Sequence, residues 1–186
     1  MARFQFEATP LPGLLLVHRD ALVDARGFLS RLFCADEFAG AGWRQPIAQI
    51  NHTLTRSPGT VRGLHFQFPP HAEAKLVTCV RGSVFDVAVD VRRDSPTWLH
   101  WHGAILSASN QCSFLIPEGF AHGFQALQGD CEMIYLHSAP YSQDAEGALN
   151  ALDPRLSITW PLPVGERSDR DVAHPFIDAT FKGVGA

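Results

Sequence analysis

The sequence predicts an all-β fold in which antiparallel strands form a sandwich or a barrel. Three observations support this prediction: short runs that alternate between apolar and polar residues, thirteen prolines and fifteen glycines that punctuate the chain, and the lack of long stretches with helical spacing. The length of 186 residues fits one domain of ordinary size. No internal repeat or linker divides the sequence, so residues 1–186 are expected to form a single domain.

The expected strands follow one another at short intervals. Alternating runs occupy residues 49–55 (QINHTLT), 63–68 (GLHFQF), 98–106 (WLHWHGAIL), 112–117 (CSFLIP) and 131–137 (CEMIYLH). In residues 75–92 (KLVTCVRGSVFDVAVDVR), Arg81-Gly82 predicts a turn between two strands. Short helices are expected at residues 34–42 and after Pro161, and the last residues, about 180–186, are expected to form a flexible tail.

The composition excludes several classes of protein. Hydrophobic residues make up 46% of the chain and charged residues 18%, which excludes intrinsic disorder. The net charge of −4 offers no basic field for nucleic acid or an anionic membrane. No aliphatic stretch approaches the ~20 residues of a membrane span, and no secretory signal opens the chain. The four cysteines are widely scattered: Cys34, Cys79, Cys112 and Cys131. Their spacing predicts free thiols and a cytoplasmic protein.

Polar and titratable groups recur on one face of several expected strands. Residues two apart in a strand point to the same side, so each such row would share one surface. Side chains of these types orient a polar ligand on a pocket floor, and exposure to solvent is the alternative explanation. The rows are Gln49, Asn51 and Thr53; His65 and Gln67; Lys75, Val77 and Cys79; and Met133, Tyr135 and His137.

Two histidines lie in segments that support a functional role, although a lone histidine is more often a hydrogen-bonded structural residue. His65 follows Arg62 in VRGLHFQF, and His122 follows a proline–glycine turn in IPEGFAHGF. The unperturbed pKa of histidine, about 6.5, allows it to take a proton at neutral pH. The fixed fork of donors on an arginine such as Arg62 suits phosphate.

These segments resemble the dTDP-4-dehydrorhamnose 3,5-epimerase family, which are sugar-nucleotide epimerases of the cupin class. The resemblance implies a cupin-type β-jelly roll (double-stranded β-helix) with short peripheral helices, usually a homodimer, that needs no metal or other cofactor. RGLHFQ and PEGFAHGF at this separation carry most of the specificity. The matching stretches are residues 24–33, 49–55, 61–67, 75–92, 95–98, 116–124, Tyr135, 152–161 and 168–171.

The resemblance also implies catalytic roles. His65 would be the base that removes the proton beside the C4 ketone of the sugar, and Asp171 would orient that histidine. Tyr135 would deliver a proton to the opposite face. Lys75 and His122 would support the enolate oxygen.

The remaining matches concern substrate binding, with a dTDP-sugar as the expected substrate. Arg26 and Arg62 would contact its diphosphate, and Gln49, Asn51, Gln67 and Tyr141 would form the rest of the binding surface. The chain departs from the family pattern at Arg31, where the family often has a glutamate. This difference affects the expected recognition of the nucleotide base.

The assigned groups suit the chemistry on general grounds. A hydrogen beside a ketone is acidic because the anion spreads onto the carbonyl oxygen, so the reaction needs a base and a donor at that oxygen. Inversion of the carbon needs a proton source on its other face. Each positioned acid or base contributes roughly 10²–10⁴-fold, so enolate support must supply much of the remaining rate.

The sequence alone also allows other functions. A metal-dependent cupin oxygenase would use histidines and a carboxylate, for which His65, His71, Glu73 and His122, or the H-x-H of residues 100–102, offer donors. A non-catalytic sugar-binding cupin would keep the arginines without needing an acid and a base. An epimerase of a single carbon (C3 or C5) and a sugar-nucleotide 3,4-ketoisomerase share the scaffold and similar chemistry.

Overall fold

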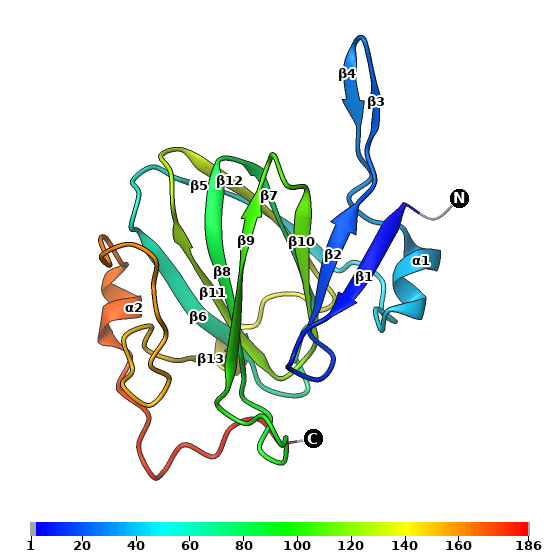
Figure 1. Cartoon of the computed structure of the whole chain (residues 1–186). Helices are drawn as coiled ribbons and strands as arrows, with labels where there is room; N and C mark the ends of the chain where they lie inside the picture. The colour runs from blue at the N-terminus through cyan, green and yellow to red at the C-terminus, as the bar shows by residue number, and fades with distance from the viewer. Residues whose placement is uncertain (1–2, 186) are drawn as a thin grey trace.

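The computed structural model describes residues 3–185 and confirms the all-β prediction. Figure 1 shows two larger sheets that face each other, with a separate two-stranded hairpin projecting from one end. The six-stranded sheet contains, in spatial order, β1 (Phe4–Ala8), β2 (Leu15–Arg19), β10 (Cys112–Ile116), β7 (Lys75–Arg81), β12 (Cys131–His137) and β5 (Gln49–Thr55). The five-stranded sheet contains β13 (Glu146–Ala148), β6 (Val61–Gln67), β11 (Phe120–Ala126), β8 (Ser83–Asp90) and β9 (Trp101–Ser107).

The order of strands confirms the jelly roll. From β5 to β8 and from β9 to β13, consecutive strands alternate between the two sheets, and all pairs within the sheets are antiparallel. The turn expected at Arg81-Gly82 is confirmed, and Gly82 adopts a φ of +78° that favours glycine. The strands on either side of this turn enter different sheets, so β7 and β8 form opposite walls of the molecule.

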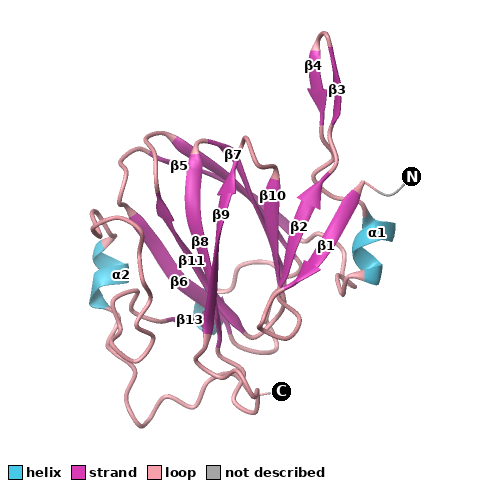
Figure 2. Cartoon of the chain, viewed as in Figure 1, coloured by secondary structure: helices cyan, strands magenta, loops and turns pink. Residues whose placement is uncertain are grey.

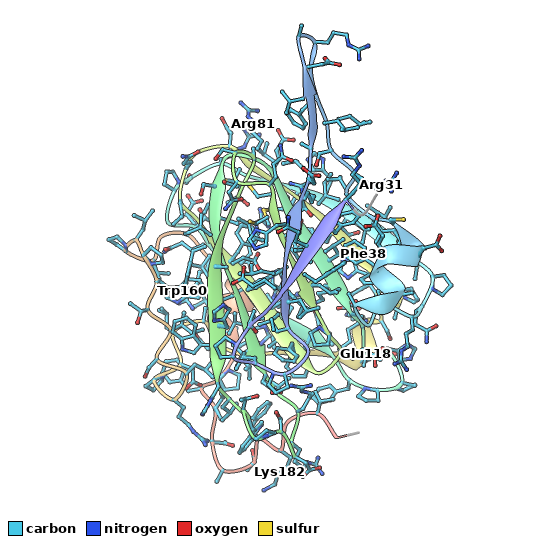
Figure 3. The ribbon with its side chains drawn as sticks, turned by 45° about the vertical axis from the view of Figure 1, so that its right-hand side comes forward. Arg31, Phe38, Arg81, Glu118, Trp160 and Lys182 are labelled. Atoms are coloured by element: carbon cyan, nitrogen blue, oxygen red, sulfur yellow. The ribbon has the colours of Figure 1, made fainter. Side chains whose placement is uncertain are left out.

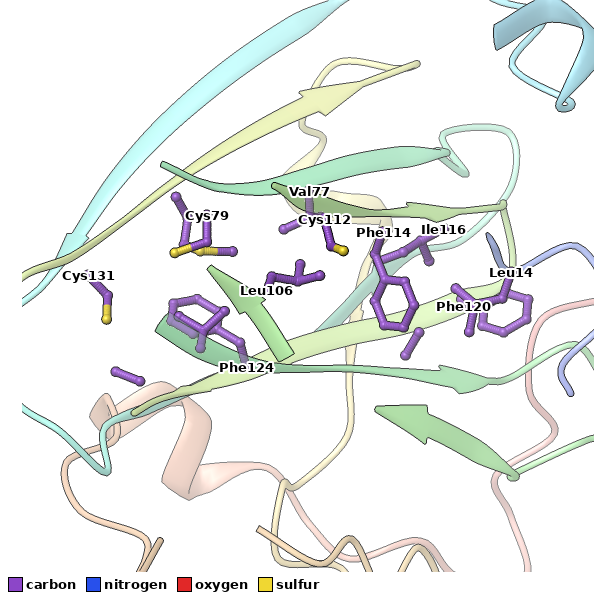
Figure 4. Packing of buried hydrophobic residues seen from close by; sticks show 14 of the residues in the cluster. Leu14, Val77, Cys79, Leu106, Cys112, Phe114, Ile116, Phe120, Phe124 and Cys131 are labelled. Carbon is purple, nitrogen blue, oxygen red and sulfur yellow. The ribbon is translucent and has the colours of Figure 1, made fainter. Parts of the chain in front are cut away.

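A buried core holds the two sheets together. Figure 4 shows Phe124 toward one end of this core and Phe114 and Phe120 toward the other, with Leu106 between them. A second buried cluster covers the outer face of the five-stranded sheet, where residues from the C-terminal third, including Leu156, pack on β6, β8 and β11. Both faces of β8 are therefore buried, including the side on which its two aspartates lie.

Helices occupy the periphery, as the secondary-structure view in Figure 2 shows. The expected helix at residues 34–42 is confirmed as α1 (Ala35–Gly40), which buries Phe38 against β1 and β2 (Figure 3). The second helix, α2 (Asp169–Ala173), begins eight residues after Pro161, and a 3₁₀ turn occupies Gln143–Ala145. No helix within residues 3–185 is long and apolar enough to cross a membrane.

Several boundaries differ from expectation. The strand expected from residue 98 begins at Trp101, because residues 95–100 form turns in which Leu99 has a φ of +61°. The proline–glycine turn expected at residues 117–119 is present, but strand β11, which begins directly after it, was not predicted. Strands β1, β2 and β13 and the two short strands at residues 22–24 and 27–29 were not predicted either.

The segment that was expected to form a flexible tail makes contacts with the body of the protein in its described part. Val184 is buried, its amide donates to the carbonyl of Val91, and its own carbonyl accepts from the amide of Arg93. A parallel bridge joins Val184 to Arg92. These backbone bonds and the apolar contact offset the conformational freedom of the glycines on either side. Residue 186 lies outside the described residues.

The projecting hairpin consists of β3 (Leu22–Asp24) and β4 (Gly27–Leu29), and Arg31 follows it near its base (Figure 3). Its apolar side chains are unusually exposed: Val23 is 78% and Leu29 is 70% exposed. The side chain of Arg26 is 90% exposed at the tip and pairs with Asp24. Isolated two-stranded hairpins are at best marginally stable in water, so this hairpin has the character of a contact surface.

Close approach between β6 and β11 requires glycine at position 123. A Cβ atom built there would lie 2.5 Å from the carbonyl oxygen of Arg62 and 2.8 Å from Leu64. We expect Gly123→Ala to lower the free energy of unfolding by about 1–3 kcal/mol, the cost of overpacking. Urea denaturation measures this change. Gly40→Ala is the control, since its Cβ would meet no atom within 4 Å, and an equal loss in both variants would contradict the explanation.

Candidate active site

A cavity of about 820 Å³ opens between the two sheets. Its walls come from β5, β7 and β12 of one sheet, from β6 and β11 of the other, and from α2 with the loop before it. The polar members of the period-two rows therefore line a pocket, with Asn51 exposed at its rim, while Val77, Cys79 and Met133 of the same rows are buried in the core. All predicted site residues except Arg26 line it: Gln49, Asn51, Arg62, His65, Gln67, Lys75, His122, Tyr135, Tyr141 and Asp171.

His65 and Asp171 form a short polar contact in the pocket. The Nε2 atom of His65 lies 2.6 Å from Oδ1 of Asp171, and the second carboxylate oxygen accepts from the amide of Gly63 at 3.4 Å. A carboxylate only accepts hydrogen bonds, so this contact assigns the proton of a neutral His65 to Nε2 and leaves the Nδ1 lone pair free. The side chain of His65 is 31% exposed, which suits a group that meets a ligand.

Helix α2 brings Asp171 to this position across 106 residues of sequence. The hydroxyl of Ser168 caps the helix by accepting from the amide of Asp171 at 3.1 Å. Burial alone would raise the pKa of Asp171, but hydrogen bonds from His65 and its other partners outweigh that effect, and the pKa is lowered. Asp171 is therefore an ionised carboxylate at neutral pH, as a group that steadies a protonated histidine must be.

Tyr135 stands on β12, in the sheet opposite His65. Its ring makes an edge contact with His122 at 5.9 Å between centroids and stacks on His137 at 6.2 Å. Burial raises the pKa of Tyr135, so its hydroxyl retains its proton at neutral pH. The geometry thus offers a protonated donor that faces the pocket from the wall across from His65.

Lys75 is a buried ammonium on β7 with defined partners. Its Nζ atom lies 3.0 Å from Oε1 of Glu73 and donates to the carbonyl oxygen of His65 at 3.1 Å. The other oxygen of Glu73 lies 3.0 Å from Nδ1 of His137. Burial raises the pKa of Glu73, but His137 and Lys75 have the larger combined effect and lower it. This group of charges supplies a fixed cation at the pocket wall.

His122 pairs with a carboxylate of its own. Its Nε2 lies 2.9 Å and 3.0 Å from the two oxygens of Asp86 on the adjacent strand β8. Asp86 is fully buried, and this burial raises its pKa despite the neighbouring histidine. In the ladder between β6 and β11, His122 is the register partner of His65, so the two histidines lie on neighbouring strands.

The rim of the pocket is a chain of hydrogen bonds. Gln49 accepts from the amide of Tyr141 and donates to Asn51, whose amide lies 3.4 Å from Nε2 of His137. The side chain of Gln67 is occupied by the protein itself, since it donates to backbone carbonyls and accepts from Ser142 at 2.6 Å. Gln67 is predicted to bind substrate; it lines the pocket, and its contacts hold the loop that carries Tyr141.

The two predicted phosphate-binding arginines are separated. Arg62 lines the pocket and donates to Thr55 and to the carbonyl of Leu54. Arg26 lies at the tip of the β3–β4 hairpin and does not line the pocket of its own chain. In Figure 1 this hairpin projects away from the strands that build the cavity.

Three groups at the pocket make contacts that sequence reasoning did not assign: His137, Asp86 and Glu73. His137 stands in the same row as Tyr135, so its place at the pocket was predicted, but its contact with Glu73 was not. Asp86 lies among apolar residues in β8, which is a signal for a buried carboxylate with a partner. Glu73 lies outside regular strands; it was considered as a metal donor, and nothing in its local sequence indicates its contacts with Lys75 and His137.

The donors considered for a cupin metal centre do not converge. Glu73 is bound to Lys75 and His137, and His122 is bound to Asp86. Within residues 3–185, the group with metal-binding donors close enough together is a different one: His65, Asp171 and His174.

The chain matches known proteins over most of its length. A family model described as dTDP-4-dehydrorhamnose 3,5-epimerase matches residues 8–179. The chain is 40% identical over 175 residues to the dTDP-4-dehydrorhamnose 3,5-epimerase of Shigella flexneri. The match covers 93% of this chain and 96% of the relative.

Solved structures agree with the sequence relatives. The structure of dTDP-6-deoxy-D-glucose-3,5-epimerase from Legionella pneumophila Philadelphia 1, in complex with dTDP-4-keto-L-rhamnose, is similar with a TM-score of 0.89. The two chains are 35% identical, and the match covers 97% of this chain and 98% of the Legionella chain. A 3′-monoepimerase from Streptomyces bikiniensis in complex with dTDP-quinovose has a TM-score of 0.86 at 32% identity, covering 91% of this chain and 86% of that chain.

The contact with Asp171 should fix the tautomer of His65. Asparagine keeps the shape of aspartate but presents both a donor and an acceptor, so Asp171→Asn should release the proton of His65 from Nε2. Nitrogen-15 NMR of the imidazole, at a pH where the ring is neutral, measures the tautomer directly. Asp169→Asn, which changes an exposed carboxylate at the first position of α2, two residues before Asp171, is the control and should leave the His65 signals unchanged. An unchanged tautomer in Asp171→Asn would remove the orienting role.

Proposed function

The chain belongs to the dTDP-4-dehydrorhamnose 3,5-epimerase family, and we propose that its pocket inverts C3 and C5 of a nucleotide-linked 4-keto-6-deoxy sugar. The activity is that of an isomerase, because each proton that is removed is replaced and no atom is gained or lost. The observation that carries the residue assignment is a base and an acid on opposing sheets, His65 on β6 and Tyr135 on β12.

The reaction begins at His65. Its free nitrogen removes the proton beside the C4 ketone, and the resulting imidazolium is stabilised by Asp171 at 2.6 Å. Negative charge develops on the ketone oxygen as the proton leaves. The ammonium of Lys75 is held at the pocket wall by Glu73, so it can support that charge without reorganising.

Inversion requires that the new proton arrive from the other face. Tyr135 keeps its hydroxyl proton at neutral pH and lines the same cavity from the opposite sheet. Proton delivery by Tyr135 to the enolate therefore gives the inverted carbon, whereas return of a proton by His65 regenerates the starting configuration.

We assign the outer part of the pocket to the nucleotide. Arg62 offers a planar fork of donors to the diphosphate, and its present contacts with Thr55 and Leu54 hold it in place. Gln49, Asn51 and Tyr141 form a hydrogen-bonded rim that suits a polar ligand. We assign no step to a metal or another cofactor, since a histidine, a tyrosine and a lysine supply every proton transfer and charge contact.

We further propose a homodimer in which the β3–β4 hairpin enters the pocket of the second copy. Its exposed apolar side chains, such as Phe28 at 66%, would be buried by such an interface. Arg26 would then reach the diphosphate in the partner's pocket, a contact that it does not make in its own chain.

A second candidate is inversion of one carbon only. The similarity to a 3′-monoepimerase at a TM-score of 0.86 favours keeping this alternative, because the same base and acid serve either reaction. The wild-type protein separates the two in deuterated water, since a double epimerase labels C3 and C5 and a monoepimerase labels one carbon.

Tyr135→Phe tests the division between base and acid. His65 can still form the enolate in this variant and return a solvent-derived proton to the original face. In deuterated water, we expect deuterium in recovered substrate of retained configuration, with the inverted product falling by roughly 10²–10⁴-fold. Mass spectrometry and NMR of the sugar measure both quantities.

The chain has two tyrosines, and both line the pocket, so Tyr141→Phe is the matched control and should still invert. His65→Ala should lose both exchange and inversion because no enolate forms. Full inversion by Tyr135→Phe would assign the acid to another residue, such as His137.

Mixed dimers test the role of Arg26. We expect Arg26→Ala and His65→Ala to be impaired separately. Their heterodimer regains one complete pocket, in which the intact hairpin of one chain serves the intact base of the other. Random reassortment should therefore restore roughly a quarter of wild-type activity, from one working site in half of the dimers. Sedimentation checks the dimer, and no recovery in a confirmed heterodimer would place Arg26 outside the partner's pocket.

A further inference from the structure

His174 lies beside the proposed catalytic pair and has no assigned role. It follows the last residue of α2, three residues after Asp171, and its ring meets that of His65 edge to face at 6.5 Å between centroids. Its Nε2 atom is buried and has no hydrogen-bond partner in the part of the chain that the structure describes. A buried polar nitrogen without a partner costs free energy, so its retention calls for an explanation.

The surroundings of His174 provide a set of metal ligands. One ring nitrogen of His65, one of His174 and one oxygen of Asp171 all lie within 4.8 Å of one another. Two imidazoles and one carboxylate suit Zn²⁺, Co²⁺ or Ni²⁺, whereas Mg²⁺ and Ca²⁺ prefer oxygen donors. Three protein ligands leave one position of a tetrahedral ion for water.

We propose that His65, Asp171 and His174 form an inhibitory binding site for a divalent transition-metal ion, with Zn²⁺ as the best-matched ion. The site differs from the cupin oxygenase centre considered above, because it uses neither His122 nor Glu73. A bound ion would inhibit the reaction and would take part in none of its steps.

The required movement is small. Ligand atoms around a tetrahedral Zn²⁺ lie about 3.3 Å apart, as follows from metal–ligand distances near 2.0–2.1 Å. The 2.6 Å contact between His65 and Asp171 would widen, and the imidazole of His174 would move inward. The backbone of His174 stays anchored because its carbonyl accepts from Asn150 at 2.8 Å. The neighbouring cation, Arg170, is paired with Glu146, which limits its repulsion of an ion.

Metal binding would remove the base whichever nitrogen of His65 is used. Coordination through Nδ1 uses the lone pair that accepts the substrate proton. Coordination through Nε2 moves the proton of the neutral ring to Nδ1, and again no free lone pair remains. The inhibition rests on the proposed function of His65, but binding of the ion does not.

The experiment therefore measures binding and activity separately on the full-length protein. Protein stripped with a chelator is titrated with Co²⁺, whose visible absorption reports a site with four or five ligands, and with Zn²⁺ by calorimetry. The same protein is assayed for epimerisation with and without Zn²⁺. The variants are His174→Gln and, as a matched control, His100→Gln, which changes an exposed histidine outside the pocket.

We expect stripped wild-type protein to be active, to bind one ion per chain and to be inhibited reversibly by Zn²⁺. His174→Gln should keep its activity without metal and lose at least about tenfold in Zn²⁺ affinity and in sensitivity to inhibition, because one ligand is gone. His100→Gln should behave as wild type.

Equal Zn²⁺ affinity in wild-type protein and His174→Gln would overturn the site. Saturable binding that needs His174 but leaves epimerisation unchanged would overturn the inhibitory role. If the protein failed to turn over a dTDP-sugar at all, the proposed function would fall, and the Co²⁺ and calorimetric titrations would still decide whether the metal site exists.

Discussion

The pocket depends on the buried ammonium of Lys75. A lysine that is 6% exposed must find partners, and this one bridges the two sheets by reaching from β7 to the carbonyl of His65 on β6. The carboxylate that compensates its charge, Glu73, also fixes His137, and His137 stacks on Tyr135. The buried ammonium of Lys75 therefore links the backbone of the base, His65, to the ring of the acid, Tyr135, through Glu73 and His137.

The jelly roll makes this arrangement possible because its strands alternate between sheets. Inward-facing positions fill the core with apolar residues at one end and line a cavity at the other. The outer face of the five-stranded sheet is covered by the C-terminal segment, which contains α2. The same chain segment that buries Leu156 therefore delivers Asp171 to His65, so packing and positioning are linked.

Much of the site could be predicted from local patterns. The rows that contain Asn51, Lys75 and Tyr135 follow from alternation, and the structure brings them to one cavity. Contacts that span long stretches of sequence could not be read in this way: the pairing of Asp171 came from a family resemblance, and that of Glu73 with His137 was not foreseen. Strand β11 was missed because Pro117 and Gly119 signal a turn, although the turn ends where the strand begins.

The two histidine–aspartate pairs differ in what they can do for the reaction. Asp171 has a lowered pKa and can stabilise a protonated His65, which is the requirement for a base. Burial raises the pKa of Asp86, which opposes full charge separation with His122. An ionised Asp86 accepts from Nε2 of His122, and in that state Nδ1 can donate to an enolate oxygen only when the ring is protonated. The ammonium of Lys75 has three donors and uses two of them on Glu73 and the carbonyl of His65. The third is free for the substrate, so the ammonium is the stronger support for the developing charge.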